Sequence, residues 1–401
     1  MTMPVAAHVE LGDLGLDQGG HLLIKRALRN VQPGSAITVT GNSTELAVHL
    51  RGWCRGQGHK IDFPETNASN ESVAIIYRGT AEIGRWRAAE CAGDATAPQN
   101  QASPAWGLAG RSATVEAGSP LFAFPLATRT EVWAQEVARL YAQALAAQWN
   151  PVTAIHWDES FDLPAEIEDA VVQIMTYLIE NETAALIIPA KFAAQIHPHF
   201  REVMQLLAIQ AADEARHIEV FTRRALLHRT KLGLSTAGGQ ASLKTLIDET
   251  DFTLVSMLLS VLGEGSFLSL LSFLHQYAPD PLTREIARLV GQDEARHVAF
   301  GVAHLTWCVN EDPSYLNRLA TAIERRHDAL TNTAGLNEEV FDALILLAAG
   351  SWQPEALHDG WNKVQKLISD MDQGRIKRLC KIGFSESSAQ SLSALHTRNF
   401  M

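Results

Sequence analysis

The chain has 401 residues, of which 46% are hydrophobic and 19% charged, and this balance excludes wholesale disorder. Its formal net charge is −12 and no long lysine or arginine run offsets it, so we expect no nucleic-acid partner. The four cysteines lie far apart without a Cys-x-x-Cys pair, which excludes a zinc-ribbon module and favours a reducing compartment. The first residues lack the features of a secretory signal, and we expect a cytoplasmic protein.

The chain begins with a small α/β domain, which we place at residues 1–80. Helical periodicity and β-branched stretches alternate there, and they predict helices at 22–31 and 44–57 and strands at 37–40, 59–63 and 72–77. Residues 81–125 are richer in alanine, glycine, serine and proline, a composition that predicts a partly flexible linker.

Nearly everything after the linker has helical periodicity, and the fold class is therefore mainly α. We expect a four-helix bundle at 126–310 and a C-terminal extension of about three shorter helices at 311–401, packed on the bundle. The predicted helices of the bundle domain are 130–148, 164–194, 200–230, 243–277 and 281–309.

The stretch 253–274 is apolar and long enough to suggest a membrane span. Glu264 lies at its centre, and a buried carboxylate must be neutralised, paired or bound to a metal ion. We therefore predict a buried bundle helix and no membrane association.

An internal repeat is the strongest feature of the sequence. The five residues Asp-Glu-Ala-Arg-His at 213–217 recur unchanged at 293–297. A glutamate and a histidine three positions apart project from one face of a helix, so Glu214 with His217, and Glu294 with His297, can each reach one metal ion.

The helix before each repeat adds a carboxylate from an apolar stretch. In the second half this is Glu264, and in the first it is Glu180 or Glu182. We favour Glu182, because it lies as far before the turn at Pro198 as Glu214 lies after it, and it falls on the apolar stripe of its helix. Glu180 remains the alternative.

A glutamate from each of two helices, with Glu-x-x-His from each of two others, is the ligand set of ferritin-like di-iron and di-manganese bundles. Mixed oxygen and nitrogen ligands suit two iron ions, with Fe/Mn and Mn/Mn pairs also open. The predicted metal ligands are Glu182, Glu214, His217, Glu264, Glu294 and His297.

Aspartates precede both ligand glutamates of the repeats. A metal-bound histidine usually donates its other N–H to a carboxylate, so we expect Asp213 to pair with His297 and Asp293 with His217. Arg216 and Arg296 would balance these charges. Apolar side chains should line a dry pocket at the site, namely Met175, Leu178, Ile179, Phe267, Leu268 and Val290.

Other histidines receive no metal role. We interpret His304 as a core histidine, and His197 and His199, at the turn between ligand helices, as surface residues.

The segments from Glu182 to His217 and from Glu264 to His297 resemble the doubled Glu…Asp-Glu-x-x-His pattern of ferritin-like di-iron carboxylate oxidases and oxygenases. The repeats look especially similar to those of arylamine N-oxygenases and of the aerobic oxidative cyclase of chlorophyll synthesis. The resemblance covers about 130–309. Arylamine N-oxygenases carry a further histidine ligand where this chain has Val290, and that departure argues against N-oxygenation of an arylamine.

The N-terminal domain resembles the sulfur-carrier domains of the TusA type, through residues 22–28, the turn at 32–34, and Trp53 with Gly58-His59. In that family a Cys-Pro-x-Pro segment at the first helix carries a persulfide. Here the corresponding residues are Asp17-Gln18-Gly19-Gly20, so sulfur transfer through that position is chemically excluded. The resemblance implies a binding or docking module.

The metal-ligand pattern and the resemblance to the oxidase family lead to one preferred function. We expect a non-haem di-iron oxidoreductase that uses O2, through a bridging peroxo or high-valent intermediate, to oxidise a small organic substrate. An external electron donor or the substrate would supply electrons, since no flavin, nicotinamide or iron–sulfur motif is visible, and a homodimer is left open.

Two alternatives use the same ligands. The first is a ferroxidase, metal-handling or peroxide-scavenging protein, and the second is a binding protein with a structural metal site. A radical-generating subunit of ribonucleotide reductase is disfavoured, because no tyrosine is well placed.

Overall fold

A computed structural model describes residues 5–64, 72–331 and 338–395. Contacts divide the chain into two compact units. The first comprises Met1–Glu90 with Thr114–Ser119, and the second comprises Cys91–Ala113 with Pro120–Met401. The predicted fold class, a mainly α chain with a small α/β domain before the helical unit, is confirmed.

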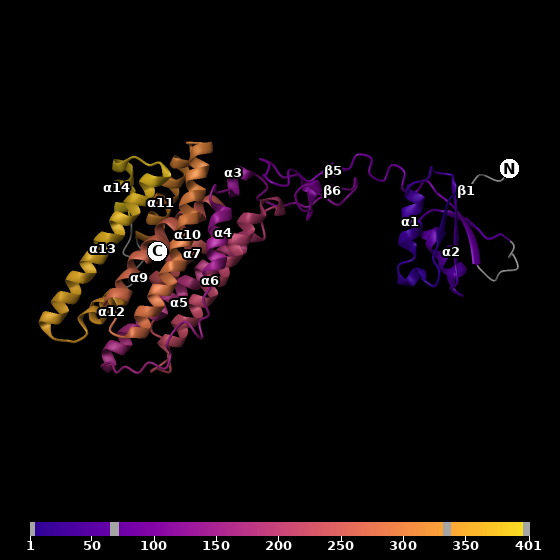
Figure 1. The fold of residues 1–401 in the computed structure, drawn as a ribbon. Coiled ribbons are helices and arrows are strands. Elements are labelled where there is room, and N and C mark those ends of the chain that lie inside the picture. Colours follow the sequence, from indigo (N-terminus) through magenta and orange to yellow (C-terminus); the bar gives the residue numbers. More distant parts are fainter. Residues whose placement is uncertain (1–4, 65–71, 332–337, 396–401) are drawn as a thin grey trace. The chain divides into compact units, whose positions relative to one another are not determined.

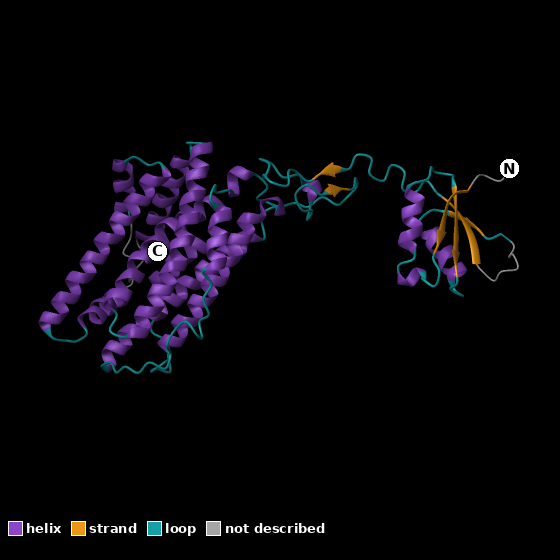
Figure 2. Ribbon diagram, viewed as in Figure 1, coloured by secondary structure: helices purple, strands orange, loops and turns teal. Residues whose placement is uncertain are grey.

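The N-terminal unit is a four-stranded sheet with two helices (Figure 2). The strand order is β1-β2-β4-β3, with β1 parallel to β2 and the other neighbours antiparallel. The strands are β1 (Val5–Glu10), β2 (Ala36–Gly41), β3 (Lys60–Asp62) and β4 (Ser72–Tyr77), and the helices are α1 (His21–Arg29) and α2 (Leu46–Gly56), with a short 3₁₀ turn η1 (Leu16–Gln18) before α1. Ile24, Ile37, Leu50 and Ile76 form the centre of its core.

Strand β1 had no counterpart in the sequence prediction. It lies at the edge of the sheet, and among its residues only Val9 is buried. An edge strand with mostly exposed side chains lacks the apolar alternation from which strands are recognised.

Part of the segment predicted as a linker belongs to the helical unit. Residues 91–113 begin at the last residue of strand β5 (Glu90–Cys91), contain the 3₁₀ turn η2 (Pro104–Trp106) and end just before β6 (Thr114–Val115), the strand that pairs with β5. Arg111 in this segment donates through Nε to the carbonyl oxygen of His199 at 2.8 Å and pairs with Glu202. Composition does not reveal such a long-range contact.

The prediction that His197 and His199 are surface residues was wrong. Their exposed fractions are 1% and 2%, because the segment after residue 91 covers the short helix η3 (Pro198–Phe200). His199 accepts from the backbone N–H of Gln99, and His197 bonds the carbonyl oxygen of Ser103. Both rings are therefore part of the packing between this segment and the bundle.

Two pairs of long helices form the centre of the second unit, α5 along α6 and α9 along α10 (Figure 1). The elements up to α10 are α3 (Arg129–Val132), α4 (Val137–Ala146), α5 (Ala165–Ala193), α6 (Arg201–Ala225), α7 (Ala237–Ile247), α8 (Phe252–Ser256), η4 (Met257–Glu264), α9 (Gly265–Tyr277) and α10 (Pro281–Glu311).

Two stretches that were each predicted as one helix form several shorter elements in the structure. The stretch 130–148 forms α3 and α4, and 243–277 forms α7, α8, η4 and α9. Asp251 caps α8 by accepting hydrogen bonds from the backbone of Thr253 and Leu254, which separates α8 from α7. Element η4 is a π-helix, whose wider turn an apolar periodicity does not reveal.

The C-terminal extension contains four helices in its described part, one more than predicted. They are α11 (Tyr315–Thr331), α12 (Glu338–Ala349), α13 (Pro354–Ile382) and α14 (Glu386–Ala394). The 29-residue helix α13 packs against α9 and α10, and α12 packs against α5. The extension thus contacts both helix pairs of the bundle.

Among the residues that the structure describes, two helical stretches are long and apolar enough to cross a membrane by length and composition, Ala165–Ala193 and Phe252–Tyr277. Within the apolar windows, 67% and 83% of the residues are buried inside the unit. Each stretch carries a buried glutamate, Glu182 in the first and Glu264 in the second.

A buried ion network joins three bundle helices. Arg224 near the end of α6 donates to Glu168 of α5 at 2.7 Å and to Asp280, the N-cap of α10, at 2.9 Å. Arg224 and Asp280 are fully buried and Glu168 is 2% exposed. The network therefore fixes the ends of the helices that carry the repeats.

Replacing Arg224 by Met should lower the free energy of unfolding by about 3–5 kcal/mol, because two carboxylates would remain buried without their cation. Arg229→Ala is the control, since the Arg229–Asp169 pair is largely exposed and its loss should cost less than about 1 kcal/mol. Denaturant unfolding measures both, and equal effects would contradict the stabilising role of the network.

Candidate metal centre

The six predicted ligands come from four helical segments and meet inside the bundle. Glu182 projects from α5, Glu214 and His217 from α6, Glu264 from the end of η4, and Glu294 and His297 from α10. None is more than 3% exposed, and Glu264 in particular is 1% exposed. Glu180, the alternative to Glu182, is only half-buried and outside the group.

The six side chains form two overlapping groups. In each group the potential ligand atoms lie within 4.8 Å of one another. One group is Glu182, Glu214, His217 and Glu294, and the other is Glu214, Glu264, Glu294 and His297. Glu214 and Glu294 belong to both, which is the arrangement needed for carboxylates that bridge two ions.

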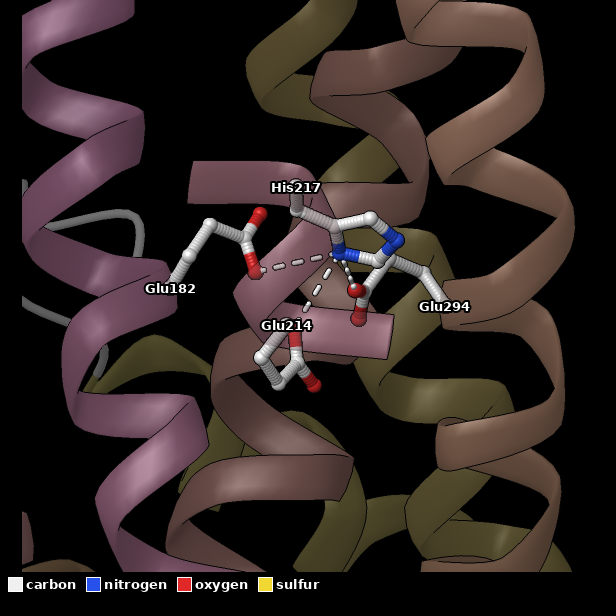
Figure 3. A group of neighbouring side chains, drawn as sticks. All are labelled: Glu182, Glu214, His217 and Glu294. Atoms are coloured by element: carbon white, nitrogen blue, oxygen red, sulfur yellow. Dashed lines mark hydrogen bonds and ion pairs between the residues drawn. The ribbon is translucent and has the colours of Figure 1, made fainter. Parts of the chain in front are cut away.

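One imidazole nitrogen faces three carboxylates in the first group (Figure 3). The distances from Nδ1 of His217 are 3.1 Å to Glu214, 3.2 Å to Glu294 and 3.5 Å to Glu182. A single ring N–H cannot satisfy three carboxylates, whereas a cation between them can bind all four groups. In the second group, Nδ1 of His297 lies 3.0 Å from Glu214 and 3.5 Å from Glu294.

Several polar atoms of the site are buried without a hydrogen-bond partner. They are Oε1 of Glu182, Oε1 of Glu214, Oε2 of Glu264, both carboxylate oxygens of Glu294 and Nδ1 of His297. Buried polar atoms normally have partners, and leaving one unpaired costs about 1–3 kcal/mol. All of these atoms belong to the predicted ligands, so the residues present fit a pair of cations.

The outer nitrogen of each histidine contacts an aspartate from the opposite repeat. Nε2 of His217 lies 3.1 Å from Asp293, and Nε2 of His297 lies 3.2 Å from Asp213. These are the pairs expected from the sequence. With Nε2 donating to the aspartate, a neutral ring would present the Nδ1 lone pair to a cation placed among the carboxylates, as metal binding requires.

The two aspartates are held by an arginine side chain and by two residues that the sequence did not indicate. Arg216 donates to Asp213 at 2.6 Å and to Asp293 at 2.8 Å. Gln148 donates to Asp213, and the indole N–H of Trp149 donates to Asp293 at 2.7 Å. Gln148 and Trp149 follow α4, outside the repeats, so no motif indicated them.

Glu264 has a further partner that the sequence did not indicate. The side-chain amide of Gln210 on α6 donates to Oε1 of Glu264 at 3.1 Å. Gln210 lies four residues, one helical turn, before Glu214, and this spacing was the available signal. The amide fixes one carboxylate oxygen and leaves the other for a cation.

Burial and mutual repulsion disfavour charge on two of the carboxylates. Burial raises the pKa of Glu182 and of Glu264 well above the ordinary value, and the neighbouring Glu294 and Glu214 raise them further. Burial also raises the pKa of Glu214, but the nearby His297 and His217 outweigh it and lower the pKa. Without cations, protons would thus have to supply the missing positive charge.

The environment favours the charged form of both histidines, in contrast to its effect on Glu182 and Glu264. Burial works against protonation of His217, yet hydrogen bonds from its ring to Asp293 and the ligand carboxylates raise its pKa well above the ordinary value. Burial also works against protonation of His297, but the negative charges of Glu214 and Glu294 outweigh it and raise the pKa. Two divalent cations would balance four ligand carboxylates with both rings neutral, and Arg216 and Arg296 balance the two aspartates.

Most of the predicted apolar lining is buried. Met175, Leu178, Phe267 and Val290 are at most 2% exposed. Leu268 does not join them, since it lines an outer pocket between α9 and α13.

No protein-family model and no curated protein matches the chain. Among solved structures, similar chains are R2-like ligand-binding oxidases.

A mutant of such an oxidase with an anaerobically reconstituted Mn/Fe cofactor is 17% identical, with 61% of this chain and 94% of that chain covered and a TM-score of 0.47. A second mutant, with an aerobically reconstituted Mn/Fe cofactor, is 16% identical, with 67% and 96% covered and a TM-score of 0.43. The enzyme from Sulfolobus acidocaldarius is 15% identical, with 59% and 89% covered and a TM-score of 0.41. The metal-centre assignment depends on the side-chain geometry of this chain.

Replacing Glu182 by Gln should weaken one of two metal-binding steps by at least about tenfold, because Glu182 belongs to only one ligand group. Glu180→Gln is the matched control, two residues away on the same helix, and should bind both ions as the wild type does. Equilibrium titration with Mn(II) measures the two steps. Equal behaviour of the two variants would exclude Glu182 as a ligand.

Metal affinity should rise with pH. In the metal-free protein Glu182, Glu264, His217 and His297 have raised pKa values, so cations must displace protons, and acid favours the protonated state. Affinity for Mn(II) should fall about tenfold per pH unit for each proton displaced, between about pH 7.5 and about pH 5.5. Calorimetric titration in buffers of different ionisation enthalpy counts the protons, and binding without proton release would contradict the prediction.

Proposed function

We propose that the helical unit is a non-haem dimetal oxidase or oxygenase, which uses O2 to oxidise a small organic substrate. The observation that carries this proposal is the pair of overlapping ligand groups, with Glu214 and Glu294 shared, in the buried centre of the bundle. The ligands are mostly carboxylates, which suits two iron ions, an Fe/Mn pair or an Mn/Mn pair better than zinc or copper(I).

Different residues of the chain have different roles in the proposed function. Glu214 and Glu294, which belong to both ligand groups, would hold both ions, and Asp293 and Asp213 would keep the imidazoles in the metal-binding tautomer. Once bound, the metal pair would supply electrons for the reduction of O2. Buried apolar neighbours such as Met175 and Phe267 keep water away from the oxidising site.

The proposal requires electrons from outside the chain. The sequence shows no flavin, nicotinamide or iron–sulfur motif, so a separate donor or the substrate would supply them. We propose a cytoplasmic protein that needs neither nucleic acid nor a membrane, with a homodimer as an open possibility.

For the N-terminal unit we propose a binding or docking role. Asp17, in the stretch that replaces the persulfide-carrying segment of TusA-type domains, lines a groove of about 600 Å³ together with His21 and Trp53. A carboxylate cannot carry sulfur, so recognition is the function that this position supports.

Anaerobic loading with Fe(II) followed by O2 tests the oxidase proposal. We expect O2 consumption in a fixed ratio to the bound iron, and a transient visible absorption that decays faster when a substrate is present. Glu264→Gln, which removes a ligand from one group, should slow O2 consumption by at least about tenfold. Glu180→Gln should behave as the wild type.

Other outcomes contradict the proposal in different ways. Continued oxidation of added Fe(II) with growth of ferric mineral would indicate metal storage. Stoichiometric metal binding without O2 consumption would indicate a structural site.

A further inference from the structure

The segment that presents Glu264 departs from α-helical geometry. Element η4 is an eight-residue π-helix that ends at Glu264, and the backbone N–H of Gly265 reaches the carbonyl oxygen of Ser260, five residues earlier. Extended π-helix is rare because each widened turn loses packing and hydrogen-bond quality. Contacts from outside this helix must therefore stabilise it.

Arg378 of the C-terminal helix α13 makes such a contact. Its Nε donates to the carbonyl oxygen of Val261 at 2.9 Å, inside the π-helix. Its guanidinium also lies against the backbone of Gly265, where a Cβ would be 2.4 Å from Nε and 2.5 Å from Cζ. Gly374 makes room on the side of α13, since a Cβ there would be 3.0 Å from Nη1.

Holding a guanidinium at this place is costly. Partial burial, together with the charge of the neighbouring Arg375, lowers the pKa of Arg378 to about 10. Among the described residues no carboxylate forms an ion pair with Arg378, and its Nη2 has no hydrogen-bond partner. A half-buried guanidinium without an ion-pair partner is in itself a poor source of stability.

Arg375, one turn earlier on α13, acts on the same segment. It donates to the hydroxyl of Ser266 at 3.4 Å, and that hydroxyl donates to the carbonyl oxygen of Leu262. Two guanidinium groups of α13 therefore contact the stretch on both sides of Glu264.

We propose that Arg378 is a positioning residue for the metal centre, and that its contacts with Val261 and Gly265 fix the π-helical turn from which Glu264 reaches the second ligand group. This inference rests on the metal centre of the proposed function and does not depend on the reaction. Glu264 belongs to only one of the two groups, so the influence of Arg378 is confined to one ion.

Arg378→Met, Arg378→Lys and Gly265→Ala test the inference in the full chain, with Mn(II) binding followed by electron paramagnetic resonance. The wild type should bind two ions. Arg378→Met should bind the first with unchanged affinity and the second about 10–100-fold more weakly, the effect typical of a lost contact behind a ligand. Arg378→Lys should recover part of the loss, and Gly265→Ala, whose Cβ displaces the guanidinium, should reproduce it.

Arg326→Met is the control, because Arg326 is a buried guanidinium whose hydrogen bonds go to Ser242 and Thr245 of α7 and not to the backbone of η4. Arg326→Met should lower the melting temperature without weakening the binding of one ion more than that of the other. If Arg378→Met bound both ions with wild-type affinities, the inference about Arg378 would be wrong and the proposed function would be unaffected. Parallel loss of both ions, in step with the melting temperature, would overturn it in favour of a merely structural role. A wild type that binds no ion would overturn the proposed function as well.

Discussion

Burial of four carboxylates in one apolar bundle is the constraint on which the rest of the structure depends. Glu182, Glu214, Glu264 and Glu294 are at most 2% exposed, and several of their oxygens have no hydrogen-bond partner. Charge of one sign cannot remain in such a place without compensation, since an unpaired buried ion costs several kcal/mol. A pair of divalent cations would supply the compensation that the protein atoms do not.

Residues around the carboxylates hold them in place, first those in direct contact with the ligands and then those further away. The aspartates of the repeats orient the imidazoles, and Arg216, Gln148 and Trp149 hold the aspartates. Further out, the Arg224 network fixes the helix ends, and α13 contacts the π-helix that carries Glu264. The C-terminal extension is thus connected to the metal centre through the backbone of one ligand segment.

The sequence predicted the bundle and the six converging residues because their signals are local. The repeated Asp-Glu-Ala-Arg-His segment gives the spacing of one helix face, and Glu264 is conspicuous in an apolar stretch. What the sequence did not predict depends on contacts between distant residues. The burial of His197 and His199 needs the segment around Arg111, Trp149 reaches Asp293 from the loop after α4, and the π-helix follows from packing that periodicity does not encode.

The most direct measurement of the central claim is anomalous diffraction at the iron and manganese edges from crystals of the metal-loaded chain. The account predicts two peaks inside the bundle, one bound by Glu182 and His217 and the other by Glu264 and His297, with Glu214 and Glu294 contacting both. A single peak bound by residues of only one group, or no peak within reach of these side chains, would contradict it.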